Sequence, residues 1–412
     1  MNLKTLLPGS TSVNGQPTTL GVMGGGQLGR MFVQAAQAMG YVTVVLDPDP
    51  ASPAGLVSHH HIRTAYDDEQ GLALLTQRCD AITTEFENVP AQALATLAAQ
   101  RPVAPSAACV AVAQDRIKEK AHFEQCAPIS GVAPAPHAVI TTDASLRAVP
   151  DALLPGILKT ARMGYDGKGQ VRVTTREALA AAWDDLDKVP CVLEKMLPLR
   201  AECSVIVARG ADGQVVTFPV QKNTHHDGIL ALTEVFDGAV DATLAQRAQA
   251  STVAIANHLR YVGVLCVEYF VVETAGGALD LVVNEMAPRP HNSGHYTQNA
   301  CDVSQFEAQV RALAGLPLTP PRQHSPTIMV NLLGDLWFQA NVVRALAGPQ
   351  PQSPPWGAVL GLPGTHLHLY GKLSARPGRK MGHLNITGAS VAQVRETTAQ
   401  VLALLGLPPL GA

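Results

Sequence analysis

The stretch LCVEYFVVETAGGALDLVVNEMAPR, residues 265–289, decides the fold of the central part of the chain. Two apolar runs flank a glycine pair at Gly276, a pattern typical of a β-hairpin. With the turn centred there, Glu268 lies opposite Asn284 or Glu285. Carboxylates that face one another across apolar strands repel, and a divalent cation removes that conflict. Mg²⁺ suits the pattern because it favours one or two carboxylates completed by water and nucleotide phosphates. The alternative is that one glutamate points to solvent.

A glycine-rich loop, LKTARMGYDGKGQ, precedes this hairpin by about a hundred residues and spans residues 158–170. Lys159 ends a predicted strand, and three glycines surround Lys168. Three glycines within six residues allow a tight loop whose N–H groups approach phosphate oxygens. The loop is no P-loop, because G-x-x-x-x-G-K-[ST] is absent. An ordinary glycine turn is the alternative, but the two lysines favour a phosphate site.

A second glycine motif lies near the N-terminus, where TLGVMGGGQLGRMF contains the pattern G-x-G-x-x-G at Gly24, Gly26 and Gly29, with Asp47 eighteen residues later. Read alone, this pattern is the fingerprint of a dinucleotide-binding unit and favours a nicotinamide oxidoreductase. A loop-to-helix junction offers its N–H groups to any phosphate, however, so a substrate phosphate also fits. A turn that only needs close strand–helix packing is the third alternative.

Secondary-structure patterns divide the chain into predicted domains. Strands and helices alternate from Leu20 to about Pro105, which implies a parallel sheet and a Rossmann-like domain. Residues 106–126 read as one helix that leaves this domain, and Val391–Leu405 reads as the final helix. The predicted division is a disordered extension at 1–17, a Rossmann-like domain at 18–115, a mixed α+β domain at 116–316 with a lid at about 157–225, and a small separate domain at 317–412.

Composition excludes several classes of protein. The 412 residues are 47% hydrophobic and 15% charged, which suits a globular protein with sizeable cores. A formal net charge of −3 argues against a nucleic-acid binder. Apolar runs are shorter than the roughly 20 residues of a membrane helix. Seven scattered cysteines without a C-x-x-C pair predict a reducing cytoplasm. The run His59-His60-His61 lacks carboxylate or cysteine partners at ligand spacing and reads as a solvated loop.

Several segments together carry a family resemblance. The glycine loop and the glutamate hairpin resemble the ATP-grasp superfamily, in which two α+β subdomains close on Mg-ATP. In chain order, the segments GGGQLGRM, DRIKEK, GYDGKGQ, NTHHDGIL, NEMAPRPHNSGHYTQNA and RPGRKMGHLN resemble the N5-carboxyaminoimidazole ribonucleotide synthetases. The resemblance runs from about Leu20 to Leu405. It implies an ATP-grasp fold, α/β and α+β, with an N-terminal parallel-sheet domain and a small C-terminal domain.

The resemblance also implies roles for individual residues. Positions that match the family's ATP contacts are Arg116, Lys159, Gly164, Tyr165, Asp166, Gly167, Lys168, Gly169, Gln170, Glu194, Lys195, Met196, Leu197, Glu202, His225, Asn284 and Glu285. Among them, residues 194–197 would line the adenine pocket and Glu202 would contact the ribose. Glu268 and Glu285 would hold Mg²⁺. Positions around the aminoimidazole ribonucleotide and the carboxylating species are Gly26, Gln27, Leu28, Tyr165, Asp166, Arg289, His291, Asn292, Ser293, Lys372 and Arg379. The catalytic set would be Lys159, Asp166, Arg289 and His291.

The implied reaction carboxylates 5-aminoimidazole ribonucleotide with ATP and bicarbonate through carboxyphosphate, as a step of purine biosynthesis. Arg289 would hold the carboxyphosphate anion, and His291 would either orient an anion or shuttle a proton. The basic segment YGKLSARPGRKMGH would supply a phosphate clamp through Lys372 and Arg379 that reaches back to the first domain. The resemblance further implies a cytoplasmic homodimer. The rival readings are another ATP-grasp ligase, a nicotinamide oxidoreductase and a non-catalytic nucleotide-binding module.

Overall fold

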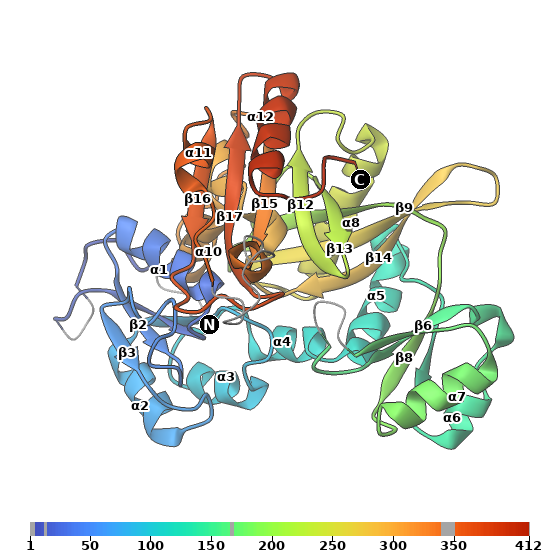
Figure 1. The fold of residues 1–412 in the computed structure, drawn as a ribbon. Coiled ribbons are helices and arrows are strands. Elements are labelled where there is room, and N and C mark those ends of the chain that lie inside the picture. Colours follow the sequence, from blue (N-terminus) through green and yellow to red (C-terminus); the bar gives the residue numbers. More distant parts are fainter. Residues whose placement is uncertain (1–4, 12–14, 165–168, 339–350, 412) are drawn as a thin grey trace, which may run out of the picture.

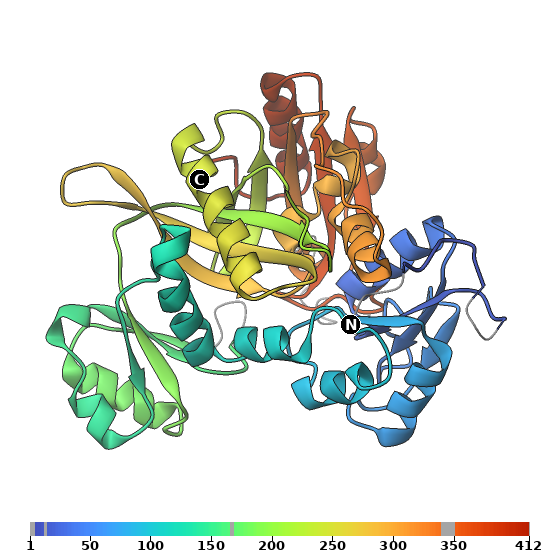
Figure 2. The same cartoon turned by 180° about the vertical axis from the view of Figure 1, so that it is seen from behind.

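The computed structural model describes residues 5–11, 15–164, 169–338 and 351–411. Figures 1 and 2 show an N-terminal domain and a lid at the two sides of the molecule, with a large sheet and its helices above them. The short helices that connect these parts run beneath the large sheet. Among the described residues, helices are too short or too polar to cross a membrane.

The N-terminal domain is the parallel sheet that the alternating pattern predicts. Its strand order is β3-β2-β1-β4, and every neighbouring pair is parallel. All residues of β1 and β4 are buried, as expected when helices cover both faces. The elements are β1 (Thr19–Met23), α1 (Gln27–Ala38), β2 (Val42–Leu46), β3 (His60–Ile62), α2 (Glu69–Arg78), β4 (Ala81–Thr84), α3 (Ala91–Ala98) and α4 (Ala107–Ala113).

Two expectations for this region are wrong. Residues 5–11 and 15–17, expected to be disordered, lie against the domain: the Leu6 amide donates to the Ala314 carbonyl, and the Tyr41 hydroxyl donates to the Leu6 carbonyl. Leu6 also packs on the apolar core beneath α1. Two residues of the histidine run, His60 and His61, belong to the edge strand β3 and not to a loop, because they pair with β2.

The central sheet has nine strands, in the order β14-β13-β9-β11-β12-β15-β17-β16, with β10 beside β9. Alternate residues of β9 point to opposite faces. Val205 and Val207 pack with α5 and α8, whereas Ile206 and Ala208 pack with α10. Figure 2 shows α5 and α8 side by side on the first face.

The elements of this part have the following bounds: α5 (Arg116–Ser130), β9 (Leu199–Arg209), β10 (Val215–Thr217), β11 (Gln221–His226), β12 (Ile229–Val235), α8 (Ala242–His258), β13 (Gly263–Glu273), β14 (Leu279–Ala287), the 3₁₀ turn η2 (Asn292–Gly294), α9 (Thr297–Ala300), α10 (Gln305–Ala314), β15 (Thr327–Leu333), η3 (Gly334–Trp337), α11 (Trp356–Leu360), β16 (Thr365–Leu369), β17 (Lys380–Thr387) and α12 (Val391–Leu404). The single helix predicted at 106–126 is two helices, because Asp115 caps the start of α5 by accepting from the Ile117 amide.

The small C-terminal domain that the sequence predicts is not separate from the central part, because its strands continue the central sheet. Strand β15 pairs antiparallel with β12, and Val330 lies opposite Leu232. Both residues belong to one apolar cluster with Ile386 and the helix residue Val394. The sheet and its core therefore continue from the central part into the C-terminal part. A run of apolar residues indicates a strand but does not reveal its partner strand.

The lid is a four-stranded antiparallel sheet of order β5-β8-β6-β7 that spans residues 137–195. It differs from the predicted range of about 157–225, because β9 and β11 belong to the central sheet instead. The lid elements are β5 (His137–Ile140), α6 (Asp143–Arg147), η1 (Asp151–Leu153), β6 (Gly156–Thr160), β7 (Gln170–Val173), α7 (Arg176–Asp185) and β8 (Cys191–Lys195). In Figure 1 the lid is the green lobe at the side of the central sheet.

Candidate active site

One cavity of about 770 Å³ lies where the N-terminal domain, the lid and the central sheet meet. Fourteen of the predicted site residues line it, from all three parts of the fold: Gln27, Leu28, Arg116, Lys159, Gly164, Gln170, Glu202, His225, Glu268, Asn284, Glu285, Arg289, His291 and Asn292. Tyr165, Asp166, Gly167 and Lys168 fall outside the described residues. Gly169 is described but does not line the cavity, and a Cβ added at this position would lie 2.6 Å from Thr160 Oγ1.

The glutamate hairpin has the predicted register. Glu268 of β13 pairs with Glu285 of β14, and a β-bulge follows Glu268 so that Asn284 has no direct opposite residue. Among the described residues, the buried Asn284 Oδ1 has no hydrogen-bond partner. Two carboxylates and an unpaired amide oxygen are the oxygen donors that Mg²⁺ prefers. The residues present therefore fit a magnesium ion.

Each glutamate of this pair faces a cation. Arg116 of α5 lies 3.5 Å from Glu285 Oε2, and His291 Nε2 lies 2.9 Å from Glu268 Oε1. Burial alone would raise the pKa of Glu268, but the adjacent His291 lowers it to about 2. Burial opposes protonation of His291, yet contact with Cys266 and with the Glu268 carboxylate raises its pKa to about 10. An ion pair thus forms at the base of the cavity.

A second carboxylate–imidazole pair adjoins the first. His225 Nδ1 of β11 lies 3.0 Å from Glu202 Oε2 of β9. Ligand atoms of Glu202, His225 and Glu268 lie within 4.8 Å of one another. Strands β9, β11 and β13 are neighbours in the sheet, so their side chains on one face converge here.

A buried charge cluster joins the lid to α5. Glu194 of β8 lies 2.8 Å from Lys159 Nζ of β6 and 3.1 Å from Lys120 Nζ of α5. Burial would raise the pKa of Glu194, but Lys120, Lys159 and Arg116 lower it to about 2. The Lys120 ammonium also donates to the Asn284 carbonyl at 2.8 Å. Sequence reasoning missed Lys120, although it lies in the quoted segment DRIKEK one turn after Arg116.

Residues 194–197, which the family resemblance assigns to the adenine pocket, do not line the cavity. The Glu194 side chain is turned toward the two lysines and is 3% exposed. The Lys195 amide donates to the Pro136 carbonyl, and the Met196 amide donates to the Pro155 carbonyl. The Leu197 carbonyl accepts from the Leu199 amide. These backbone groups thus hold the end of β8 in place.

The N-terminal glycine loop is already hydrogen-bonded to carboxylates. The Gly26 and Gly29 amides donate to the two oxygens of Glu85 at 2.6 and 2.8 Å, and the Gly25 amide donates to Asp47 Oδ2 at 2.7 Å. The expectation that these amides face a phosphate is therefore wrong for this structure. In the first turn of α1, the amides of residues 27 and 28 lie too early to have intrahelical partners.

Glu85 and Glu87 are functional candidates that sequence reasoning missed. Both follow β4 at the carboxyl edge of the parallel sheet, where ligands bind in such folds, and both line the cavity. Burial raises the pKa of Glu85, an effect partly offset by the Gly29 and Gly26 amides. The Arg289 guanidinium overcomes the effect of burial on Glu87 and lowers its pKa to about 2. The sequence signal that could have identified both residues was their position shortly after a buried strand.

Side chains of η2 hold His291 in place. His291 Nδ1 lies 2.9 Å from Ser293 Oγ, which lies 2.8 Å from Ser204 Oγ. Ser293 is fully buried and does not line the cavity, so it positions His291 rather than touching a ligand. Asn292 does line the cavity, and its buried Nδ2 has no hydrogen-bond partner among the described residues.

The basic C-terminal segment reaches the N-terminal domain, as predicted. A smaller cavity of about 300 Å³ brings Lys372 and Arg379 together with Gly26, Gln27 and Glu85. Gln27 and Glu85 line both cavities, so the two adjoin. Burial, and then repulsion by Arg379, lower the pKa of Lys372 to about 8. The Lys372 ammonium donates to the Lys380 carbonyl at 2.6 Å.

Comparison with known proteins places this geometry in a family. Three family models match: a ribonucleotide synthetase preATP-grasp domain at residues 17–114, an ATP-grasp domain at 126–306, and a phosphoribosylaminoimidazole carboxylase C-terminal domain at 327–397. The N5-carboxyaminoimidazole ribonucleotide synthase of Brucella melitensis is 41% identical over 93% of this chain and 98% of its own.

Solved structures of such enzymes share the fold. The Staphylococcus aureus N5-carboxyaminoimidazole synthetase with ADP is 34% identical, with a TM-score of 0.82 over 97% of this chain and 99% of its own. The Aspergillus clavatus enzyme with ADP and 5-aminoimidazole ribonucleotide is 28% identical, with a TM-score of 0.81 over 95% and 99%. The chain belongs to the N5-carboxyaminoimidazole ribonucleotide synthase family of ATP-grasp proteins.

Proposed function

We propose that the protein carboxylates 5-aminoimidazole ribonucleotide with bicarbonate and ATP, giving N5-carboxyaminoimidazole ribonucleotide, ADP and phosphate in purine biosynthesis. One observation carries the proposal: a single cavity joins the lid lysine Lys159, the hairpin glutamates and the Arg289–His291 pair. A relative with the same fold binds ADP and the ribonucleotide together. The smaller adjoining cavity supplies cations for a substrate phosphate.

The nucleotide half of the cavity supplies charge and alignment for phosphoryl transfer. Bicarbonate is a poor electrophile, because hydroxide would have to leave, and phosphorylation to carboxyphosphate provides phosphate as leaving group. When bound, Mg²⁺ neutralises phosphate charge, and Glu268, Glu285 and Asn284 would hold it. Arg116, Lys159 and the loop at 164–170 contact the phosphates, and Glu202 with His225 contacts the ribose side. Residues 194–197 do not line the cavity, and the adenine contacts that the family resemblance implies for them stay a prediction.

The half of the cavity where carboxylation takes place holds an anion next to the exocyclic amine of the ribonucleotide. Arg289, fixed by Glu87, presents paired N–H donors to bicarbonate and carboxyphosphate. The ion pair with Glu268 keeps His291 protonated at neutral pH, which favours a hydrogen-bond donor over a proton shuttle. Asp166 is the candidate to receive the amine proton. Carboxyphosphate hydrolyses readily, so water has to be kept out of this part of the cavity.

The substrate phosphate lies between the C-terminal clamp and the start of α1. Lys372 and Arg379 provide its positive charge, and the amides of Gln27 and Leu28 complete the site. Carboxylates bonded to the Gly25 and Gly26 amides disfavour a dinucleotide pyrophosphate there, which argues against a nicotinamide enzyme. We further propose that the protein acts in the cytoplasm as a homodimer.

Phosphate release with Mg-ATP, omitting bicarbonate or the ribonucleotide in turn, tests the proposal. We expect the ribonucleotide to stimulate phosphate release strongly and the carboxylated product to require bicarbonate. Indifference to the ribonucleotide, with turnover on another acceptor, would reassign the protein to a sister ATP-grasp activity.

A further inference from the structure

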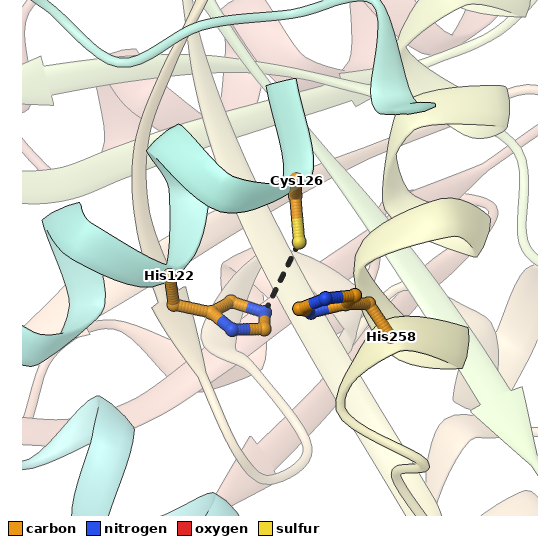
Figure 3. Close-up of side chains that lie close together, drawn as sticks. All are labelled: His122, Cys126 and His258. Atoms are coloured by element: carbon orange, nitrogen blue, oxygen red, sulfur yellow. Dashed lines mark hydrogen bonds between the residues drawn. The ribbon is translucent and has the colours of Figure 1, made fainter. Parts of the chain in front are cut away.

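Three potential metal ligands lie together outside the active site. His122 and Cys126 come from α5 and His258 from the last turn of α8, and Figure 3 shows the sulfur and the two rings converging between the helices. One ligand atom from each residue lies within 4.8 Å of the other two. His122 Nε2 and Cys126 Sγ are 3.4 Å apart, and the ring centroids of the two histidines are 5.0 Å apart.

The spacing suits a tetrahedral transition metal. His122 and Cys126 are separated by one helical turn, which puts both side chains on one face of α5. Bond lengths of about 2.3 Å for Zn–S and about 2.0 Å for Zn–N place tetrahedral sulfur and nitrogen ligands about 3.6 Å apart. The observed separation of 3.4 Å is close to that value. Imidazole and thiolate are the ligand types that select such metals over Mg²⁺.

Access also suits a metal. His122 and Cys126 are buried, whereas His258 is exposed, so an ion can enter from the His258 side.

We propose that His122, Cys126 and His258 bind one thiophilic divalent transition metal of the Zn²⁺ type, with water as the fourth ligand. The metal–sulfur bond forms as the Cys126 thiol loses its proton to solvent. The bound ion links α5 to α8. It lies apart from the oxygen-rich magnesium position and does not depend on the proposed catalytic function.

Titration of the metal-free full-length protein with Co²⁺ tests the proposal, because Co²⁺ bound to a thiolate absorbs by sulfur-to-metal charge transfer. We expect one equivalent to produce this band, and Zn²⁺ to displace it. The Cys126→Ala variant should lose the band. His258→Gln should weaken Co²⁺ binding at least about tenfold, since one of three protein ligands is lost.

Matched controls separate this site from other histidines and cysteines. Cys109→Ala removes another buried cysteine of the same apolar cluster, and His60→Gln removes an exposed histidine of the β3 run. Both variants should keep the band. The active-site group Glu202, His225 and Glu268 contains no sulfur and cannot produce it.

Zn²⁺ should also raise the thermal midpoint of the wild type, and the rise at the same Zn²⁺ concentration should be smaller in His258→Gln. Absence of a thiolate band in the wild type, or its survival in Cys126→Ala, would overturn the proposal. If Cys126→Ala fails to fold, His258→Gln decides, because that side chain is exposed. Unchanged Co²⁺ affinity in His258→Gln would then show that the three residues form only a Cys–His contact.

Discussion

At the scale of single residues, Glu285 is one of the oxygen donors that fit a magnesium ion, and its side chain is accessible to solvent. Its side chain is 42% exposed and contacts Arg116 at the edge of the cavity. Glu285→Gln should therefore leave the fold intact while lowering kcat for ATP turnover by at least about 100-fold, because charge stabilisation of the phosphoryl group is lost. Phosphate release measures the effect, and circular dichroism checks the fold.

Glu273→Gln provides the matched control for this change. It lies on the same hairpin, at the end remote from the cavity, and pairs with Arg200. We expect this variant to keep normal turnover. Near-normal ATP hydrolysis by a folded Glu285→Gln protein would contradict the magnesium assignment.

Lys372 makes substrate binding depend on pH. Its pKa is lowered to about 8, first by burial and then by Arg379, and only the protonated ammonium attracts a phosphate. We therefore expect kcat/KM for the ribonucleotide to fall as pH rises through about 8, since this ratio reports ionisations of the free enzyme. In Lys372→Arg the fall should move to higher pH, because arginine stays protonated. An identical profile in both proteins would count against the clamp.

Substitution of Arg379 should weaken binding of the ribonucleotide but not of ATP. Arg379→Ala should raise KM for the ribonucleotide at least about tenfold while changing KM for ATP little, because a charge-assisted contact to a single substrate is lost. Steady-state kinetics with each substrate varied in turn measures this. Arg376→Ala removes a neighbouring charge that does not line either cavity and should change neither value. Equal increases in KM for the ribonucleotide and for ATP would show that Arg379 does not contact the ribonucleotide phosphate.

At the element scale, Glu194 fixes the lid strands to α5. Its carboxylate is shared by Lys159 and the fully buried Lys120. Glu194→Gln leaves both ammonium groups buried without a counter-charge, which should cost about 3–5 kcal/mol of unfolding free energy. Urea unfolding measures the loss. Glu177→Gln, an exposed change on α7, should cost little.

The same pair has a defined pH dependence. The pKa of Glu194 is lowered in the folded protein to about 2 from an ordinary 4.5, so its contribution to stability is present above pH 4.5. That contribution is lost as pH falls toward about 2, because the folded carboxylate must then be protonated. The difference between wild type and Glu194→Gln should shrink over this window. A constant difference would contradict the buried ion cluster.

Local sequence patterns predict some elements well and others poorly. The hairpin around Gly276 is confirmed with Glu268 opposite Glu285, because turn residues fix strand register. Asp115, by contrast, breaks a segment that reads as one helix, since a capping aspartate looks like any polar helical residue until its side chain is placed. Contacts of Glu87 with Arg289 and of Lys120 with Glu194 join residues remote in sequence, so a local pattern could not show them.

At the scale of the whole molecule, the C-terminal segment completes both the sheet and the substrate site. Strand β15 extends the sheet from β12, and Lys372 and Arg379 reach the start of α1. Because Leu232 and Val330 share one core, residues 317–412 expressed alone should fail to unfold cooperatively. Thermal melting of that fragment measures this, with the intact protein as control. A cooperative transition in the fragment would restore the independent domain that the sequence predicts.

Domain order and family could be predicted from the sequence because glycine loops, apolar alternation and the late basic segment are local signals. The joining of strands into one sheet depends on long-range pairing. For this reason the lid limits differ from expectation, and the sequence did not predict that the central and C-terminal parts share one sheet. The partners of buried charged side chains also come from distant parts of the chain, so local sequence patterns could not predict them.

We propose that transfer of the γ-phosphoryl group activates bicarbonate within one cavity. Turnover with ¹⁸O-labelled bicarbonate, followed by mass analysis of the released phosphate, tests it most directly. Phosphorylation of bicarbonate leaves one bicarbonate oxygen on the phosphate, so we expect ¹⁸O in the inorganic phosphate whenever the ribonucleotide is carboxylated. Carboxylated product accompanied by unlabelled phosphate would contradict the account, because bicarbonate would then have reacted without forming carboxyphosphate.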